Sequence, residues 1–244
     1  MKTLVIIPSR LSASRLPGKP LLKINGISII SHVYKKAKEA DIGDVFVAAE
    51  DQEIVDDVKK NGGEAILTSN NHKTGTDRIY EAFLKLGRRD IELVMNLQGD
   101  EPLMNTKDIQ NLNSNMINTK SDLGTLAAKI DDKKVFENRN IVKVITEESL
   151  DVSKFPKALN FMRKLDIENN QAYHHLGIYC YNVEVLKKFV SFKQSQNEIK
   201  NRLEQLRALD NNININVALA KSAPIGVDTE EDFMAIKKIM EYKS

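Results

Sequence analysis

The sequence predicts an α/β fold in which a parallel β-sheet is covered by helices on both faces. Short apolar runs alternate with helical repeats over residues 1–97. Residues 91–97 are apolar at almost every position, as in strands that are buried on both faces. Polar segments that carry glycine follow the predicted strands. This alternation of strands and helices is typical of right-handed crossover units.

The elements of the first half follow from local patterns. Predicted strands cover residues 5–7, 44–49, 65–68 and 91–97, and predicted helices cover residues 29–40, 51–61 and 77–85. Ile29, Ile30, Val33 and Ala37 recur at the spacing of one helical face. The second helix begins at Asp51, a good N-cap residue, and ends at a glycine pair.

The second half is more mixed. Predicted strands cover residues 123–130, 142–146, 172–181 and 213–220, and predicted helices cover residues 183–189, 197–211 and 230–242. The strand at 213–220 alternates large apolar with small or polar residues, the period of a half-buried strand. The sequence contains no internal repeat and no linker rich in Pro, Gly or Ser. We therefore expect one domain with an inserted layer that binds the substrate.

Composition excludes several classes of protein. The 244 residues are 41% hydrophobic and 29% charged, with a formal net charge of +2, which gives no support to a nucleic-acid or membrane-surface role. Cys180 is the one cysteine; we interpret it as a core residue, with a catalytic thiol as the alternative, and no Cys/His cluster has zinc spacing. The N-terminal segment is typical of a first strand, not of a signal peptide, so we expect a cytoplasmic protein.

The most informative segment is the basic loop of residues 8–20. It follows the first predicted strand and contains Gly18 and three cations, Arg10, Arg15 and Lys19. Backbone N–H groups, a following helix N-terminus and these cations would together bind phosphates. The loop has neither the Walker pattern nor the dinucleotide glycine pattern. The alternative is an ordinary basic loop between a strand and a helix.

Ligands of open parallel sheets bind beyond the carboxyl ends of the strands. Three polar segments follow predicted strands at that edge: the basic loop, residues 72–78 and residues 98–102. The sequence therefore predicts that these three segments meet at one site.

Two aspartates far apart in the chain are candidate ligands of a hard cation. Asp100 follows a buried strand, and Asp228 precedes the last predicted helix. Mg²⁺ is typically held by one or two carboxylates together with phosphates and water. The alternatives are a turn before Pro102 and a helix N-cap at Asp228 or Thr229. Capping by Thr229 would leave Asp228 available for metal.

Other polar residues have two interpretations each. Thr74, Gly75 and Arg78 could contact a nucleotide, or Thr76 could simply cap the next helix. His174 and His175 are adjacent in a strand and must point to opposite faces, which makes a zinc site a weak interpretation. Glu204 and Arg207 are spaced to form a surface ion pair. Motifs of serine hydrolases, metalloproteases and kinases are absent from the sequence.

Taken together, these motifs resemble those of the 3-deoxy-manno-octulosonate cytidylyltransferases, also called CMP-Kdo synthetases, over nearly the whole chain. The resemblance is carried by residues 6–10 (Ile-Ile-Pro-Ser-Arg), 14–21 (Ser-Arg-Leu-Pro-Gly-Lys-Pro-Leu), 24–26 (Ile-Asn-Gly), 74–78 (Thr-Gly-Thr-Asp-Arg), 96–102 (Asn-Leu-Gln-Gly-Asp-Glu-Pro), 175–179 (His-Leu-Gly-Ile-Tyr), 203–207 (Leu-Glu-Gln-Leu-Arg) and 226–232 (Gly-Val-Asp-Thr-Glu-Glu-Asp). The blocks at 175–179 and 203–207 are the most specific.

The resemblance implies a Rossmann-like nucleotidyltransferase fold and transfer of CMP from CTP to Kdo, with release of pyrophosphate, for lipopolysaccharide biosynthesis. It also implies Mg²⁺ dependence and a homodimer. We expect a single domain over residues 1–244, with a nucleotide-binding part at about 1–115 and 217–244. A smaller mixed layer at about 116–216 would bind the sugar and form the dimer.

The resemblance also assigns roles to residues. Lys19, Arg15, Asp100 and Asp228 would be catalytic, and the two aspartates would bind Mg²⁺. The nucleotide would be bound by Pro8, Arg10, Ser14, Arg15, Lys19, Thr74, Gly75 and Arg78. The sugar acid would be bound by Gln98, Arg163, His175, Tyr179, Glu204 and Gln205.

Two segments depart from the family pattern. Residues 161–166 (Phe-Met-Arg-Lys-Leu-Asp) replace a Ser-Arg-x-x-Ile-Pro segment, and Asn201 or Arg202 replaces an acidic residue expected before Leu203. Two alternatives therefore remain open. One is a cytidylyltransferase for a related acid, such as 8-amino-Kdo or a sialic-like sugar, and the other is a catalytically silent nucleotide-binding regulator on the same fold.

Overall fold

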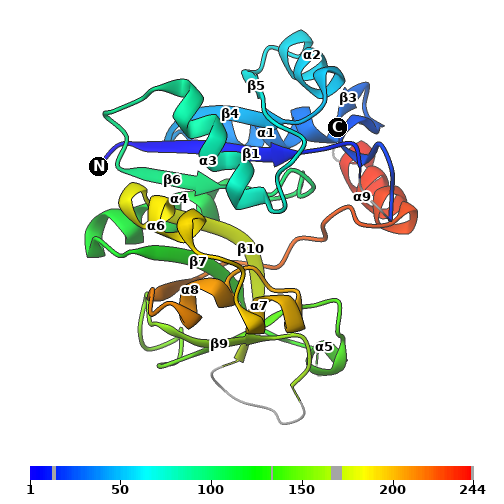
Figure 1. Cartoon of the computed structure of the whole chain (residues 1–244). Helices are drawn as coiled ribbons and strands as arrows, with labels where there is room; N and C mark the ends of the chain where they lie inside the picture. Colours follow the sequence, from blue (N-terminus) through cyan, green and yellow to red (C-terminus); the bar gives the residue numbers. More distant parts are fainter. Residues whose placement is uncertain (13–14, 133, 166–171, 243–244) are drawn as a thin grey trace. The chain divides into compact units, whose positions relative to one another are not determined.

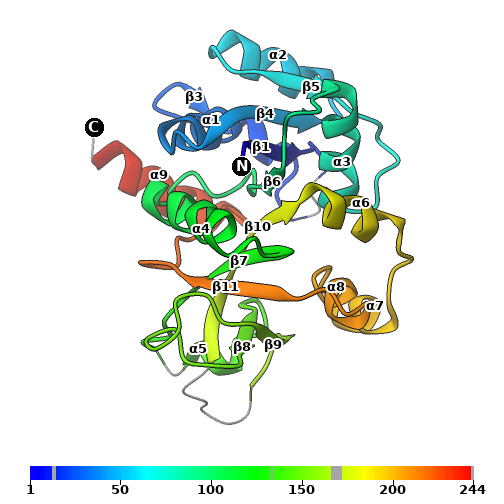
Figure 2. The same cartoon turned by 90° about the vertical axis from the view of Figure 1, so that its left-hand side faces the viewer.

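The computed structural model describes residues 1–12, 15–132, 134–165 and 172–242 (Figures 1 and 2). The chain divides into two compact units. The N-terminal unit comprises Lys2–Ile91, Met95–Lys107 and Pro224–Ser244. The middle unit comprises Met1, Glu92–Val94 and Asp108–Ala223.

The N-terminal unit is built on parallel strands. Its sheet contains β1 (Thr3–Ser9), β4 (Gly43–Ala49) and β5 (Ala65–Leu67). β6 (Leu93–Asn96) is the neighbour of β1 on the side away from β4, and it belongs to this unit from Met95 onward. β1 pairs with β4 in parallel, and β4 pairs with β5 in parallel. Residues 4–7 of β1 are fully buried, because this strand is central and both of its faces are covered.

Helices cover both faces of this sheet. They are α1 (Ile29–Glu39), α2 (Gln52–Lys60) and α3 (Gly75–Leu86), and α9 (Glu230–Tyr242) completes the unit. α1 and α3 lie on opposite faces of β1 and β4 (Figures 1 and 2). α3 begins two residues before the expected start, and its N-cap is Thr74 and not Thr76, because the Thr74 hydroxyl accepts a bond of 3.2 Å from the Asp77 amide.

A short hairpin separates the basic loop from α1. The chain passes through a 3₁₀ turn, η1 (Lys19–Leu21), and then through β2 (Lys23–Ile24) and β3 (Ile27–Ser28). Asn25 and Gly26 both have positive φ, as a two-residue Asn-Gly hairpin turn requires. The hairpin occupies residues 23–28, between the basic loop and the helix expected from residue 29, and α1 begins at Ile29 as predicted. The α1 N-terminus is capped by Ser28, whose hydroxyl accepts from the Ser31 amide.

The middle unit has a mixed sheet. β10 (Ala172–Asn182) pairs antiparallel with β7 (Leu123–Ala128), and β11 (Ile215–Leu219) pairs with β7 in parallel. β8 (Lys143–Thr146) pairs antiparallel with both β10 and β9 (Ala158–Met162). Its helices are α4 (Thr106–Thr119), α5 (Lys134–Glu137), α6 (Val183–Ser191), α7 (Gln196–Asn201) and α8 (Leu206–Asp210).

The helix expected at residues 197–211 is two short helices. α7 ends at Arg202, which has a left-handed backbone with φ of 53°. α8 then runs in a new direction and turns Arg207 inward, where its guanidinium bonds the Glu198 carboxylate at 2.8 and 2.6 Å. The expected surface position of Arg207 is therefore wrong: Arg207 is 2% exposed and also lies over the ring of Phe189.

The predicted fold class is confirmed as α/β with a mostly parallel sheet flanked by helices. Cys180 is fully buried, and burial raises the pKa of its thiol, as expected for a core residue. None of the helices in the described part of the chain is both long and apolar enough to span a bilayer.

Candidate active site

A pocket of about 340 Å³ opens in the N-terminal unit at the carboxyl ends of β1, β5 and β6. The predicted site residues among its lining are Pro8, Arg10, Arg15, Lys19, Thr74, Gly75, Arg78, Gln98, Asp100 and Asp228. The edge rule for parallel sheets thus located the pocket correctly. Ser14 lies outside the described residues.

Lys19 joins the two predicted metal ligands. Its Nζ lies 2.7 Å from Asp100 Oδ2 and 3.4 Å from Asp228 Oδ1. Arg15 also contacts Asp228, at 2.9 Å. The Lys19 side chain is only 14% exposed, so these charges interact more strongly than they would on an open surface. Two carboxylates that are 128 positions apart in the chain therefore converge on one ammonium group.

Thr229, and not Asp228, caps the N-terminus of α9 with its side chain. The Thr229 hydroxyl accepts from the Asp232 amide at 3.2 Å, and Asp232 Oδ2 accepts from the amides of Asp228 and Thr229. Only the backbone of Asp228 takes part in this cap. Its carboxylate is left to contact Lys19 and Arg15.

Close backbone approach brings the loops of the pocket together. A Cβ on Gly99 would lie 2.9 Å from the Pro8 carbonyl oxygen, so only glycine fits between the ends of β1 and β6. The Val227 amide donates to the Asp100 carbonyl at 2.9 Å. This bond holds the segment that carries Asp228 against the loop that carries Asp100.

Glu101, which the sequence analysis did not select, lies beside this site but is not among the residues that line the pocket. Its Oε2 is buried and has no hydrogen-bond partner among the residues that the structure describes. Burial, followed by the negative charges of Asp100 and Asp228, raises the pKa of Glu101 to about 8. A sequence signal existed, because Glu101 directly follows a candidate metal ligand at the end of a buried strand.

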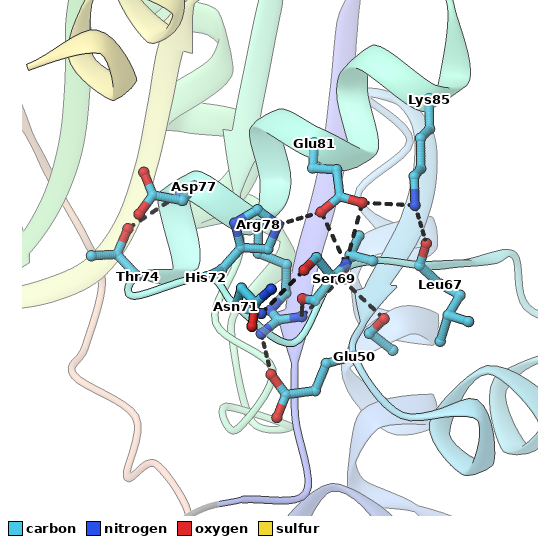
Figure 3. A network of polar contacts seen from close by, with 12 residues as sticks. Glu50, Leu67, Ser69, Asn71, His72, Thr74, Asp77, Arg78, Glu81 and Lys85 are labelled. Atoms are coloured by element: carbon cyan, nitrogen blue, oxygen red, sulfur yellow. Dashed lines mark hydrogen bonds and ion pairs between the residues drawn. The ribbon is translucent and has the colours of Figure 1, made fainter.

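Arg78 lines the pocket, but its guanidinium is held by protein groups (Figure 3). One terminal nitrogen donates to Thr68 Oγ1 at 2.8 Å and to the Ser69 carbonyl at 3.1 Å. The other forms an ion pair with Glu50. Both side chains of the pair are buried, at 4% and 10% exposed.

Glu81 forms a second branch of the same network (Figure 3). Its carboxylate accepts from the Ser69 amide, from His72 Nε2 and from Lys85. Burial alone would raise the pKa of Glu81, but the bonds from Lys85, His72 and Ser69 lower it to about 2. Glu81 therefore stays ionised and fixes the segment that leads from β5 into α3.

The middle unit brings three of the predicted sugar-binding residues close to one another. The rings of His175 and Tyr179 lie 5.5 Å apart, and Glu204 is one of the charges that raise the pKa of Tyr179. Burial is the main cause of that rise. Burial, followed by the neighbouring His174, lowers the pKa of His175 to about 3. Both rings are therefore uncharged near neutral pH.

The tautomer of His175 follows from its partner. The Thr125 hydroxyl donates to the Ile178 carbonyl at 2.7 Å, so it accepts from His175 Nε2 at 3.0 Å. Gln205 is buried, at 6% exposed. Two predicted sugar ligands remain, Gln98 and Arg163. Gln98 lines the pocket of the N-terminal unit.

Arg163 is held by backbone carbonyl groups. Its guanidinium donates to the carbonyls of Arg139, Asn201 and Arg202 at 3.1–3.2 Å. Lys143, which the sequence analysis did not select, donates from Nζ to the carbonyls of Asn138, Ile141 and Arg163 at 2.7–2.9 Å. No sequence pattern marked Lys143, because a lysine in an apolar strand is usually exposed.

A basic loop and an acidic pair at the carboxyl edge of parallel strands are typical of α/β proteins that bind phosphorylated ligands. The profile of the cytidylyltransferase family matches residues 4–215. The chain belongs to this family.

Full-length relatives share about 40% of their residues with the chain. The 3-deoxy-manno-octulosonate cytidylyltransferase of Thermodesulfovibrio yellowstonii is 42% identical over 98% of both chains. The protein of the same name from Haemophilus influenzae is 38% identical over 98% of this chain and 99% of the relative.

Solved structures agree with these relatives. A CMP:2-keto-3-deoxy-manno-octonic acid synthetase complexed with CTP superposes with a TM-score of 0.90 and 33% identity, and all of both chains is covered. A UDP-glucose pyrophosphorylase complexed with UDP-glucose is 12% identical with a TM-score of 0.72, over all of both chains, which shows a shared fold.

Proposed function

We propose that this protein is a 3-deoxy-manno-octulosonate cytidylyltransferase. It transfers CMP from CTP to the anomeric hydroxyl of Kdo and releases pyrophosphate, a step of lipopolysaccharide synthesis. The observation that carries the proposal is the convergence of Asp100 and Asp228 on Lys19 inside a pocket that also contains Arg10 and Arg15. Relatives of this name at about 40% identity over the full length support it.

The cations of the basic loop act on the triphosphate. When the sugar hydroxyl attacks the α-phosphorus, negative charge grows on the α-phosphoryl oxygens and on the leaving pyrophosphate. Arg10, Arg15 and Lys19 bind these oxygens and stabilise that charge. Because the groups are already in place, little reorganisation is needed as the reaction proceeds.

The two aspartates fit a magnesium ion. Their converging oxygens are the hard ligands that Mg²⁺ prefers, and Asp100 and Asp228 would supply both. In the described ranges of the chain no group of three or more His, Cys, Asp or Glu side chains is suited to a metal, so phosphate oxygens and water would complete the coordination. When bound, the ion supplies electrostatic stabilisation of the phosphoryl oxygens.

The nucleoside is bound by the loops at the ends of β1 and β5. We assign Pro8, Ser14, Thr74 and Gly75 to this part of the site. Gly75 lies against the Pro8 ring, since a Cβ at this position would be 3.4 Å from it, so the two loops are in contact here. Arg78 shapes the wall of the pocket through its bonds to the segment before Thr74.

The sugar acid is bound by Gln98, Arg163, His175, Tyr179, Glu204 and Gln205. The uncharged rings of His175 and Tyr179 suit sugar hydroxyl groups. The nucleotide-binding part corresponds to about residues 1–115 and 217–244, and the sugar-binding and dimer-forming part to about 116–216. The enzyme acts in the cytoplasm as a homodimer.

Pyrophosphate release tests this proposal. The purified protein is incubated with Mg²⁺, each of the four nucleoside triphosphates and a panel of Kdo, 8-amino-Kdo and sialic acid. We expect release only with CTP and Kdo. Preference for another acid would change the assigned acceptor. CTP binding without release with any acid would instead indicate a silent nucleotide-binding regulator.

A further inference from the structure

We propose that Glu50 is a positioning residue that joins two walls of the nucleotide pocket. Glu50 follows β4 and is not itself among the residues that line the pocket. Its Oε1 accepts from the Ser12 hydroxyl at 2.9 Å. Its Oε2 pairs with Arg78, a contact that Figure 3 shows. Ser12 belongs to the basic loop, whereas Arg78 belongs to α3. The inference rests on the proposed function, because it takes CTP as the ligand of the pocket.

The first wall is the basic loop, which is attached to the end of β4 at two adjacent points. Besides the bond between Ser12 and Glu50, the Leu11 amide donates to Asp51 Oδ2 at 2.8 Å. The Gly18 amide then donates to the Leu11 carbonyl at 3.1 Å and closes the loop. Glu50 and Asp51 therefore fix the position of the loop that carries the phosphate-binding cations.

Asp51, which follows β4, bonds the basic loop and does not cap the helix that it precedes. Asp51 occupies the N-cap position of α2 but makes no side-chain capping bond to that helix. Its carboxylate accepts from Leu11 instead. Aspartate at this position normally stabilises the helix by accepting from its first amides. Here that oxygen is used to hold the basic loop.

The second wall is the segment between β5 and α3. Arg78 donates to Thr68 Oγ1 and to the Ser69 carbonyl, and the Thr68 hydroxyl in turn donates to the Ala49 carbonyl at 3.0 Å. Figure 3 shows this bonding around Arg78, with His72 and Thr74 further along the same segment. The position of the segment thus depends on the orientation of the Arg78 guanidinium.

The charge of Glu50 is needed for this arrangement. Arg78 is 4% exposed, and a buried guanidinium that loses its carboxylate partner is strongly disfavoured. Without Glu50 the guanidinium would reorient, and the Ser12 bond would weaken at the same time. Since one carboxylate holds both walls, its loss would cost the pocket the preorganisation that favours CTP binding.

The principal test is Glu50→Gln, which keeps the shape of the side chain and removes its charge. We expect the dissociation constant for CTP and the KM for CTP to rise about tenfold, a typical effect of losing one ion pair that orders a site. The KM for Kdo should stay unchanged. The matched control is Glu53→Gln, which removes the same charge from an exposed position on α2 and should bind CTP as the wild type does.

A second variant tests the loop contact alone. Ser12→Ala removes an exposed hydroxyl and should fold normally. It should weaken binding of CTP and of inorganic pyrophosphate by the same factor, about threefold. In the Glu50→Gln background the same change should have a smaller effect, because Ser12 acts through Glu50 and the amide oxygen of glutamine is a weaker acceptor than a carboxylate.

The inference is wrong if folded Glu50→Gln binds CTP as tightly as the wild type. It is equally wrong if the KM values for CTP and Kdo rise together, as general loosening of the fold would cause. If Glu50→Gln does not fold, Ser12→Ala decides: unchanged binding of CTP and pyrophosphate overturns the inference. Failure of the proposed function is separate, because wild-type protein that binds CTP but releases no pyrophosphate with any acid contradicts only that proposal.

Discussion

Replacement of Lys19 by methionine would separate the two roles that the structure gives this residue. Methionine keeps most of the volume of the side chain and removes its charge. In the structure, Lys19 holds Asp100 and Asp228 together at 2.7 and 3.4 Å. In the reaction that we propose, its ammonium group stabilises charge on the phosphoryl oxygens.

The effect on stability follows from the distances. Two oxygens within these distances of one Nζ lie no more than about 6 Å apart, and two unit charges at that separation repel by about 2.8 kcal/mol at an effective dielectric constant near 20. Asp100 is 29% exposed and Asp228 is 43% exposed, so solvent screens much of this repulsion. We expect Lys19→Met to lose about 1 kcal/mol of unfolding free energy at low salt.

The effect on catalysis should be larger. Removing one preorganised donor from a site of developing charge typically lowers kcat by about 10²–10³, or roughly 3–4 kcal/mol. The assays are pyrophosphate release under saturating CTP and Kdo, and urea unfolding at low and high salt. Lys85→Met is a control, because it removes a lysine that is paired with Glu81 and not with the aspartates.

Two results would refute this reasoning. An unchanged kcat would remove Lys19 from the mechanism. A stability loss that is the same at low and high salt would show that repulsion between Asp100 and Asp228 is not its cause, because repulsion between partly exposed charges is screened by salt.

Three further predictions concern other parts of the molecule. Asp100→Asn should lower turnover by at least about a thousandfold while the unfolding midpoint changes little, because it removes a proposed metal ligand and no core packing; substantial Mg²⁺-dependent activity would contradict the assignment. Lys143→Met should lose about 2–4 kcal/mol in urea unfolding, since three partly buried carbonyl bonds lose their donor, and relief of the buried charge offsets part of this cost; an unchanged midpoint would show that these bonds contribute nothing. Two groups should lower stability as the pH is lowered, whereas Glu101, whose folded pKa is raised to about 8, opposes them between about pH 8 and 4.5. His175 has a folded pKa of about 3 and an ordinary value of 6.5, so the unfolded chain takes up a proton first between these values. Glu81, with a folded pKa of about 2 and an ordinary value of 4.5, adds a further loss below about pH 4.5. Urea midpoints at pH 7, 5.5 and 4 measure these effects, and His175→Gln should remove the loss of stability that His175 causes between pH 6.5 and 4.5; an identical curve for this variant would contradict the neutral, buried ring.

Local patterns predicted those elements whose signals lie within one segment. The apolar spacing of residues 29–37 gave α1, and the acidic start of residues 230–232 gave α9, because one buried face or one cap is enough to define a helix. The Asn-Gly turn at residues 25–26 was an equally local signal that was overlooked. α4 was missed because asparagine and threonine mask the buried positions Ile109, Leu112 and Met116.

The candidate pocket could also be predicted, since chain order decides which loops reach the carboxyl edge of a parallel sheet. Lys19 and Asp100 came from two such segments and Asp228 from the segment before the last helix, and all three meet in the structure. The partners of the buried cations could not be predicted in the same way. A guanidinium or an ammonium group can pair with any acid or carbonyl that packing brings near it.

The sequence by itself determined the order of strands and helices, the edge of the sheet at which chemistry occurs and the charged residues gathered there. Only the tertiary structure decided that Arg78 pairs with Glu50, that Arg207 pairs with Glu198 and that Asp51 serves the basic loop in place of its helix. The physical reason is that burial makes an unpaired charge costly, so each charged group takes whichever partner the packed chain brings within reach. That partner belongs to another segment, and its identity is fixed only when the segments pack together.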